Sequence, residues 1–192
     1  MNSVIENKLS ELEITQKQFW NIDRGTANLL SIIIKASNYR NIVEVGTSNG
    51  YSGIWLGLAA KETNGKVVTI EFHKCRYDVA VENFKLCKLE NIVDARQGMA
   101  IDELIDLAKE DYNSTEEQFL DFAFVDANKA QYIKYFELID AKLRKGGLIA
   151  FDNMLSHKEK VQDTLEALQN NPNYQIQMVN TEAGLLLAYK LK

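Results

Sequence analysis

The chain has 192 residues, with 27 Asp plus Glu against 22 Lys plus Arg, so its formal charge is −5. This length fits one domain, residues 1–192, with a single buried core. The acidic balance argues against the broad basic surface of a non-specific nucleic-acid binder. No apolar run approaches the roughly 20 residues that span a bilayer, and no signal peptide is recognisable. Two cysteines form neither a disulfide framework nor a metal cluster. We therefore expect a cytoplasmic protein without a membrane partner.

The first 38 residues are predicted to be helical. Apolar residues recur at helical spacing from Ile5 to Phe19, and residues 26–36 make a second helical segment. We expect these helices to pack before or across a core formed by residues 39–192. The first helix is a candidate homodimer surface, because homodimers are the commonest oligomers.

Five short apolar runs then alternate with helix-length segments. The runs are rich in Val, Ile and Phe, as is typical of strands buried on both faces. They are residues 41–45, 66–70, 92–96, 121–125 and 148–151. Among the intervening segments, residues 74–87 place Tyr77, Phe84 and Leu86 near one apolar stripe. This alternation predicts right-handed crossovers and a parallel sheet with helices on both faces.

The C-terminal part breaks the alternation. After a helix around residues 158–169, two strand-like runs, 174–179 and 185–190, follow each other across a turn at 182–184. A hairpin of this kind adds antiparallel strands to the edge of a parallel sheet. The predicted fold is therefore α/β, with a seven-stranded, mostly parallel sheet and an antiparallel C-terminal hairpin. The charged stretch 109–117 is predicted to be a solvated loop.

The first predicted strand leads into a glycine-rich loop, EVGTSNGYSG at residues 44–53. Glycines let a backbone approach a ligand closely, and the helix that follows presents free N–H groups. A dinucleotide loop requires G-x-G-x-x-G, whereas this loop has G-x-x-x-G-x-x-G with Glu44 two residues before its first glycine. Glu44 would repel a pyrophosphate and attract a cationic amine. Glu71, at the end of the second strand, can accept both hydroxyls of a ribose.

Five sequence blocks, VEVGTSNGYSGIWLGLA, TIEF, RQGMA, FVDANKAQY and GGLIAFDN, resemble S-adenosylmethionine-dependent O-methyltransferases. They are similar to the metal-dependent group that contains catechol and caffeoyl-coenzyme A O-methyltransferases and short bacterial members. The resemblance extends from Trp20 to the C-terminus, with all blocks in order. It implies a Rossmann-like class I methyltransferase fold and S-adenosylmethionine as cofactor.

The resemblance also implies a cofactor site. Glu44 and Gly46 would lie under the methionine part, Glu71 would hold the ribose, and the 98–100 turn would flank the adenine. Taken singly, the glycine-rich turn is more often plain turn chemistry, Met99 is more often a core residue, and Glu71 could be a strand-end acid that faces water. The expected cofactor residues are Asn21, Ile22, Glu44, Gly46, Ser48, Tyr51, Ser52, Glu71, Phe72, Gly98, Met99, Ala100 and Asp126.

Three oxygen-bearing side chains, Asp126, Asp152 and Asn153, follow the fourth and fifth predicted strands. In open α/β sheets, ligands gather outside the carboxyl ends of strands. Two carboxylates and an amide oxygen suit Mg²⁺, or another divalent cation such as Ca²⁺ or Mn²⁺. Taken alone, Asp126 reads as a helix N-cap and the other two as a polar turn. The resemblance makes metal ligation the better interpretation.

Lys129 stands three residues after Asp126, on the first helical turn. A nearby divalent cation and a helix N-terminus both favour a neutral lysine, so Lys129 is the expected general base, with Asp126 as the second catalytic residue. Most lysines are solvated surface residues, and what favours catalysis here is that the D-x-x-K spacing lies in the FVDANKAQY block that resembles the family. The tetrapeptide at 126–129 contains no aromatic gate. We assign no role to His73 or His157.

The expected reaction is methyl transfer to a hydroxyl of a vicinal diol or catechol-like small molecule. Lys129 would remove the proton, and the oxyanion would attack the sulfonium methyl in line. Two alternatives stay open. The first is methylation of a hydroxylated uridine in tRNA, which the acidic balance disfavours and which would need a basic patch, formed by Lys142, Lys145, Lys158 and Lys160. The second is a cofactor-binding module without catalysis, which the intact candidate residues disfavour.

Overall fold

The computed structural model describes residues 3–109 and 119–192. Its strands form a seven-stranded sheet in the order β3-β2-β1-β4-β5-β7-β6. They are β1 (Asn41–Val45), β2 (Lys66–Glu71), β3 (Val93–Gln97), β4 (Leu120–Val125), β5 (Leu143–Phe151), β6 (Tyr174–Val179) and β7 (Leu185–Lys190). β2 runs parallel to β1 and β3, β4 runs parallel to β5, and β7 is antiparallel to β5 and β6. The predicted α/β class and the C-terminal hairpin are confirmed.

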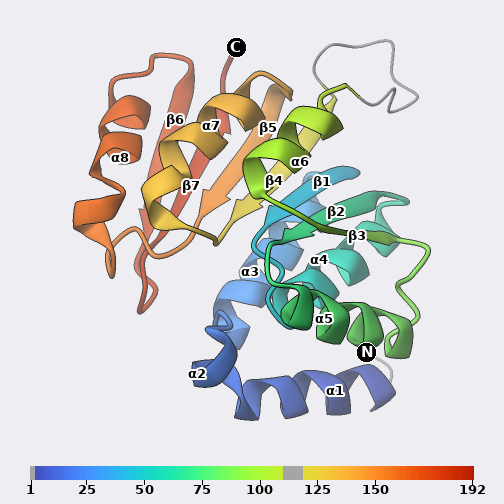
Figure 1. The fold of residues 1–192 in the computed structure, drawn as a ribbon. Coiled ribbons are helices and arrows are strands. Elements are labelled where there is room, and N and C mark those ends of the chain that lie inside the picture. The colour runs from blue at the N-terminus through green and yellow to red at the C-terminus, as the bar shows by residue number, and fades with distance from the viewer. Residues whose placement is uncertain (1–2, 110–118) are drawn as a thin grey trace. The chain divides into compact units, whose positions relative to one another are not determined.

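The chain divides into two compact units, Met1–Met99 and Ala100–Lys192. The helices of the first unit are α1 (Ser3–Ile14), α2 (Gln16–Phe19), α3 (Arg24–Ala36), α4 (Tyr51–Glu62) and α5 (Lys74–Leu86). α4 packs on β1 and β2, α5 packs on β2 and β3, and α4 contacts both α3 and α5 (Figure 1). α3, α4 and α5 therefore form one layer against the strands of this unit.

The second unit repeats this layered packing. Its helices are α6 (Ala100–Leu107), η1 (Lys129–Gln131), α7 (Tyr132–Asp140), η2 (Lys158–Lys160) and α8 (Gln162–Gln169). α7 packs on β4 and β5, α8 packs on β6, and α7 contacts both α6 and α8 (Figure 1). Every residue of β4 is buried, as its continuous apolar run predicts. The interpretation of residues 1–192 as one domain stays a prediction.

Two local predictions were wrong. β5 begins at Leu143, before the apolar run, because Leu143 pairs with Leu120 across a register shift. Leu86 is not part of the buried stripe of α5, since it is 54% exposed and the buried residues of that helix are Ala80, Asn83 and Phe84. The charged stretch 109–117 lies outside the described residues, apart from Lys109.

Apolar residues of the N-terminal helix α1 pack inside the first unit. Leu9 and Leu12 of α1 are buried, and α1 contacts α5. The helical pattern from Ile5 to Phe19 is interrupted at Thr15, where α1 gives way to α2. A homodimer through α1 stays a prediction. Among residues 3–109 and 119–192, no helix is both long and apolar enough to cross a membrane.

Lys190 is a buried cation that holds the end of α7. Its Nζ donates to the carbonyl oxygens of Asp140 at 2.7 Å and Leu143 at 3.0 Å, and lies 2.8 Å from Asp140 Oδ1. Lys190→Met would leave these carbonyls without their donor, so we expect the free energy of unfolding to fall by about 2–3 kcal/mol. Chemical denaturation measures this change. The exposed Lys192→Met variant should change it by less than about 0.5 kcal/mol, and equal values for the two variants would contradict the assignment.

Candidate functional site

The glycine-rich loop of the first unit turns repeatedly into the left-handed backbone region between β1 and α4. Gly46, Ser48 and Gly50 have φ values of 104°, 50° and 86°. Gly50 also packs tightly, since a Cβ there would lie 3.0 Å from the ring of Phe84 and 3.3 Å from the backbone of Ala80. The loop therefore needs glycine for its conformation and for the approach of α5.

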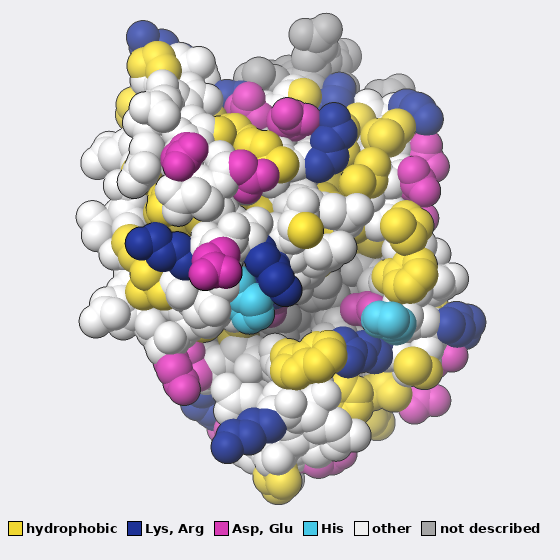
Figure 2. All heavy atoms as spheres, turned by 60° about the vertical axis from the view of Figure 1, so that its left-hand side comes forward, with side chains coloured by type: hydrophobic (Ala, Val, Ile, Leu, Met, Phe, Trp, Pro, Cys, Tyr) yellow, Lys and Arg dark blue, Asp and Glu magenta, His cyan; other side chains and the backbone are white. Residues whose placement is uncertain are grey.

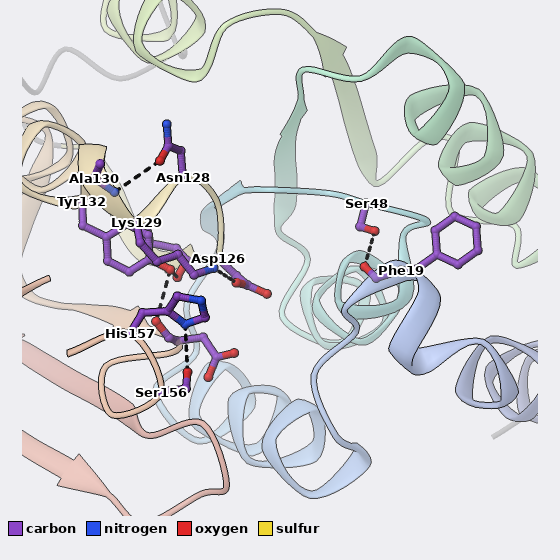
Figure 3. Close-up of polar contacts among 11 residues, drawn as sticks. Phe19, Ser48, Asp126, Asn128, Lys129, Ala130, Tyr132, Ser156 and His157 are labelled. Carbon is purple, nitrogen blue, oxygen red and sulfur yellow. Dashed lines mark hydrogen bonds and ion pairs between the residues drawn. The ribbon is translucent and has the colours of Figure 1, made fainter. Parts of the chain in front are cut away.

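The Glu71 carboxylate fixes this loop to the end of β2. Its Oε2 accepts from Ser48 N at 2.8 Å, and its Oε1 accepts from His73 N at 2.8 Å. A carboxylate has about four lone-pair sites, so Glu71 keeps the capacity to accept further donors. Ser48 Oγ in turn donates to Phe19 O at 2.7 Å (Figure 3). Ser48 thus links the predicted ribose-binding acid to the segment that precedes Trp20.

Glu44 lies beneath the loop and is fully buried. Its Oε2 accepts from Thr69 Oγ1 at 2.5 Å, and Thr69 Oγ1 lies 2.5 Å from Thr47 Oγ1. Glu44 Oε2 is also the atom that a Cβ on Gly53 would meet at 3.0 Å. The acid therefore supports the loop from below, and its direct contact with a cofactor amine stays a prediction.

Two large apolar side chains, Phe72 and Met99, are exposed just after the ends of β2 and β3. Phe72 and Gly98 directly follow Glu71 and Gln97, which are register partners, and Gly98 N donates to Glu71 O at 3.0 Å. Phe72, Met99 and Trp20 are exposed, Trp20 by 71%. An exposed apolar set of this kind marks a surface suited to a ligand.

A cation lies against the exposed Trp20 ring. The guanidinium carbon of Arg76 is 4.5 Å from the centroid of the Trp20 ring, and Trp20 has a φ of 57°. Arg76 therefore stacks on the indole of Trp20, which directly precedes the expected cofactor residues Asn21 and Ile22.

Other predicted cofactor residues serve local packing. Tyr51 is buried and donates from its hydroxyl to Glu13 Oε1 at 2.7 Å; burial and this carboxylate raise its pKa. Asn21 Nδ2 donates to Leu12 O at 3.2 Å, and Ile22 is buried. Ser52 lies in the first turn of α4, and Ala100 begins α6 of the second unit. For these residues, cofactor contact stays a prediction.

The second unit brings the predicted metal ligands together at two paired strand ends. Val125 of β4 and Phe151 of β5 are register partners, so Asp126 and Asp152 follow directly at neighbouring positions. Asp152 N donates to Val125 O at 3.0 Å, and the Asp152 side chain is buried. Asn153 comes next, in the left-handed region with a φ of 63°.

Lys129 joins this site through an ion pair. Its Nζ lies 2.7 Å from Asp126 Oδ1, and the two side chains are only 15% and 17% exposed (Figure 3). Asn128 caps the short helix η1, because its Oδ1 accepts from Ala130 N at 3.2 Å. The lysine side chain therefore pairs with the carboxylate three residues before it, as the D-x-x-K spacing predicts.

Sequence reasoning missed Tyr132, which ties the two strand ends together. Its hydroxyl lies 3.1 Å from both Val125 O and Asp152 O, and its ring centroid is 5.6 Å from Lys129 Nζ. Burial, followed by the charges of Asp126 and Asp152, raises its pKa well above the ordinary value. Tyr132 is the last residue of the FVDANKAQY block. Its place in that block was the one sequence signal that could have identified it.

His157, to which we assigned no role from the sequence, also lies at this site. Its ring is beside the Lys129–Asp126 pair in Figure 3, and its backbone N–H donates to Asn153 O at 3.0 Å. Partial burial, followed by the positive charges of Lys129 and Lys160, lowers its pKa below the ordinary value of a histidine. On the face in Figure 2, histidine side chains reach the surface, which agrees with the exposure of His157.

The donor set fits a hard divalent cation. Two carboxylates and one amide oxygen, from Asp126, Asp152 and Asn153, are typical Mg²⁺ or Ca²⁺ ligands and leave positions for water and substrate. Within the described ranges, no cluster of three or more His, Cys, Asp or Glu side chains could hold a metal ion. The proposed ligands include only two side chains of these types, Asp126 and Asp152, because the third, Asn153, is an amide.

Comparison with known structures defines the class. The fold matches the crystal structure of an O-methyltransferase from Bacillus cereus in complex with SAH, with a TM-score of 0.84, 26% identity, and coverage of 99% of this chain and 92% of that one. The fold is therefore that of a Rossmann-like methyltransferase. The sequence profile described as O-methyltransferase matches residues 3–190, so the chain belongs to the O-methyltransferase family. The resemblance seen in the sequence is confirmed.

Two plant relatives show how far the similarity extends. Tricin synthase 1 of Oryza sativa subsp. japonica is 34% identical over 145 residues, which are 74% of this chain and 57% of the rice protein. Caffeoyl-CoA O-methyltransferase of Medicago sativa is 27% identical over 201 residues, which are 94% of this chain and 80% of that protein. The chain thus spans little more than half of the rice relative.

Proposed function

We propose that the protein transfers the methyl group of S-adenosylmethionine to one hydroxyl of a vicinal diol or catechol-like small molecule, with the help of a divalent cation. The observation that carries this proposal is the arrangement of Asp126, Asp152 and Asn153 at paired strand ends, with Lys129 ion-paired to Asp126. Membership of the O-methyltransferase family and the similarity to a structure in complex with SAH support the choice of cofactor.

The first unit would hold the cofactor, which supplies a methyl group on a positively charged sulfur. The buried Glu71 carboxylate, already held by two backbone N–H groups, would accept the ribose hydroxyls. The exposed Phe72 and Met99 side chains would flank the adenine.

Glu71→Gln tests this cofactor assignment. Glutamine has one acceptor oxygen where Glu71 has two, so one backbone N–H of Ser48 or His73 would face an NH₂ group. We expect the affinity for SAH to fall about 10- to 100-fold, measured by isothermal titration calorimetry. Glu82→Gln, on the exposed side of α5, is the matched control and should bind SAH as the wild type does. Unchanged affinity in Glu71→Gln would remove this residue from the cofactor site.

The second unit would activate the acceptor. Asp126, Asp152 and Asn153 would hold a divalent cation, and a bound cation of this kind lowers the pKa of a coordinated hydroxyl. Lys129 would take the proton of the reacting hydroxyl, and Asp126, whose Oδ1 lies 2.7 Å from Lys129 Nζ, would orient the resulting ammonium group. A bond forms between the acceptor oxygen and the methyl carbon, the sulfur–methyl bond breaks, and SAH and a methyl ether result. Tyr132 would keep the two strand ends in register.

The positions of the lysines give little support to the alternative acceptor, a hydroxylated uridine in tRNA. Lys142 and Lys145 lie at the start of β5, whereas Lys158 and Lys160 follow its end. A strand of nine residues is about 25 Å long, so these four lysines form no single basic patch.

A methyl-transfer screen with labelled cofactor tests the proposed function. It compares catechols, caffeoyl esters and bulk tRNA, each with and without Mg²⁺. The proposal expects Mg²⁺-dependent labelling of a small vicinal diol. Labelling of tRNA alone would replace the proposed acceptor, and SAH binding without transfer to any acceptor would favour a cofactor-binding module.

A further inference from the structure

We propose that the β6–β7 turn, residues 181–184, positions the acceptor site, with Gly184 as its positioning residue. This inference rests on the proposed function, because it takes Asp152 and Asn153 to be site residues. The turn lies at the right place for such a role. β5 and β7 are antiparallel and pair Phe151 with Leu186, so the turn before β7 lies at the end of β5 that carries Asp152.

Three backbone hydrogen bonds hold the segment after Asn153 on this turn. Met154 N donates to Gly184 O at 2.9 Å, and the N–H groups of Leu155 and Ser156 both donate to Ala183 O at 3.0 Å. The next residue, His157, donates from its N–H to Asn153 O, which closes the segment back on the site. Every residue between Asn153 and His157 is therefore bonded to the turn.

Only glycine permits this contact at position 184. Gly184 has a φ of 82°, and a Cβ there would lie 2.4 Å from Leu155 Cγ and 2.7 Å from Leu155 N. The second of these atoms belongs to the backbone, so a rotamer change of Leu155 could not relieve the clash. Gly184 N also donates to Thr181 Oγ1 at 3.0 Å and to Thr181 O at 3.2 Å, and these two contacts fix the shape of the turn. A side chain at 184 must displace the segment that carries Asn153.

A displacement of this kind should slow the reaction and spare the cofactor. A shift of about 1 Å in a reacting group can cost about 10²-fold in rate. We therefore expect Gly184→Ala to lower kcat about 10- to 100-fold and to leave the affinity for SAH unchanged. In hydrogen exchange, the amides of residues 154–156 should lose protection, because their acceptors move.

Gly146→Ala is the matched control. Gly146 lies in the same unit with a φ of 81°, and the nearest atoms to a Cβ there are Arg144 Nη1 at 3.3 Å and Tyr189 Oη at 3.6 Å. Both variants force alanine into the left-handed region, so both should lose stability, and Gly184→Ala should lose more because its Cβ also clashes with Leu155. Only Gly184→Ala should lose turnover and the protection at residues 154–156. Equal turnover of the two variants would overturn the positioning role.

A milder variant keeps the test decisive if Gly184→Ala does not fold. Thr181→Val removes the hydroxyl that accepts from Gly184 N, and should lower kcat about threefold with unchanged SAH affinity. Unchanged kcat and unchanged exchange at residues 154–156 in Thr181→Val would overturn the proposal. A wild type that transfers no methyl group contradicts the proposed function itself, whereas an active wild type with equally active turn variants contradicts the positioning role alone.

Discussion

Replacing Lys129 by methionine should lower kcat about 10³-fold, with SAH affinity unchanged. A general base contributes roughly 10²- to 10⁴-fold, and methionine keeps the length of the side chain without its basic nitrogen. Lys129→Arg should be as inactive as Lys129→Met. Arginine keeps the positive charge beside Asp126, but it cannot lose a proton in a protein. Steady-state methyl transfer from labelled cofactor measures both variants.

The pair of Lys129 variants separates proton removal from an ion-pair role. If Lys129 only neutralised Asp126, Lys129→Arg would keep most of the activity. Lys134→Met is the matched control, because Lys134 also pairs with a carboxylate three residues away, Glu137, at 2.9 Å on the exposed side of α7. It should keep wild-type turnover.

The second large effect is expected at Asp152, one of the proposed metal ligands. Asp152→Asn keeps the shape of the side chain but removes the charge that a hard cation requires. We expect kcat to fall at least about 100-fold, and a chelator to reduce wild-type transfer to the background. The affinity for SAH should not change in either case. These values come from activity assays across a Mg²⁺ titration and from calorimetry with SAH.

Asp121→Asn is the matched control for Asp152→Asn. Asp121 is also buried and lies at the start of β4, where it is ion-paired with Arg144. Loss of the Asp121 charge should lower the free energy of unfolding. Turnover should stay within about twofold of the wild type, because the Asp121–Arg144 pair lies at the opposite end of β4 from Asp126. Transfer to the true acceptor that persists in excess chelator would show that the metal role is wrong.

The buried strands could be predicted because their signal is local. Residues 41–45, 174–179 and 185–190 match the observed β1, β6 and β7, since continuous or alternating apolar runs depend little on distant partners. The start of β5 could not be predicted, because it depends on pairing with Leu120 rather than on apolar residues. Leu86 was misplaced for a similar reason: its spacing fits the stripe, but it lies in the last turn of α5 and is exposed.

The candidate site was partly predictable for the same physical reason. Parallel strands that pair in register bring the residues after them together, which places Asp126 beside Asp152. Contacts made through the intervening loops leave no periodic signal. The bonds of Tyr132 to two strand ends, the approach of His157 to Lys129, and the contact of Gly184 with Leu155 all depend on such loops.

The proposed function requires the second unit to activate one of two adjacent hydroxyls of the acceptor. The most direct measurement compares initial rates of methyl transfer to a catechol and to the matched phenol that lacks the neighbouring hydroxyl, with Mg²⁺ and with chelator. Our account predicts rapid methylation of the catechol in Mg²⁺, and background rates for the phenol and for both compounds in chelator. Equal rates for catechol and phenol, or rates that do not change with chelator, would contradict it.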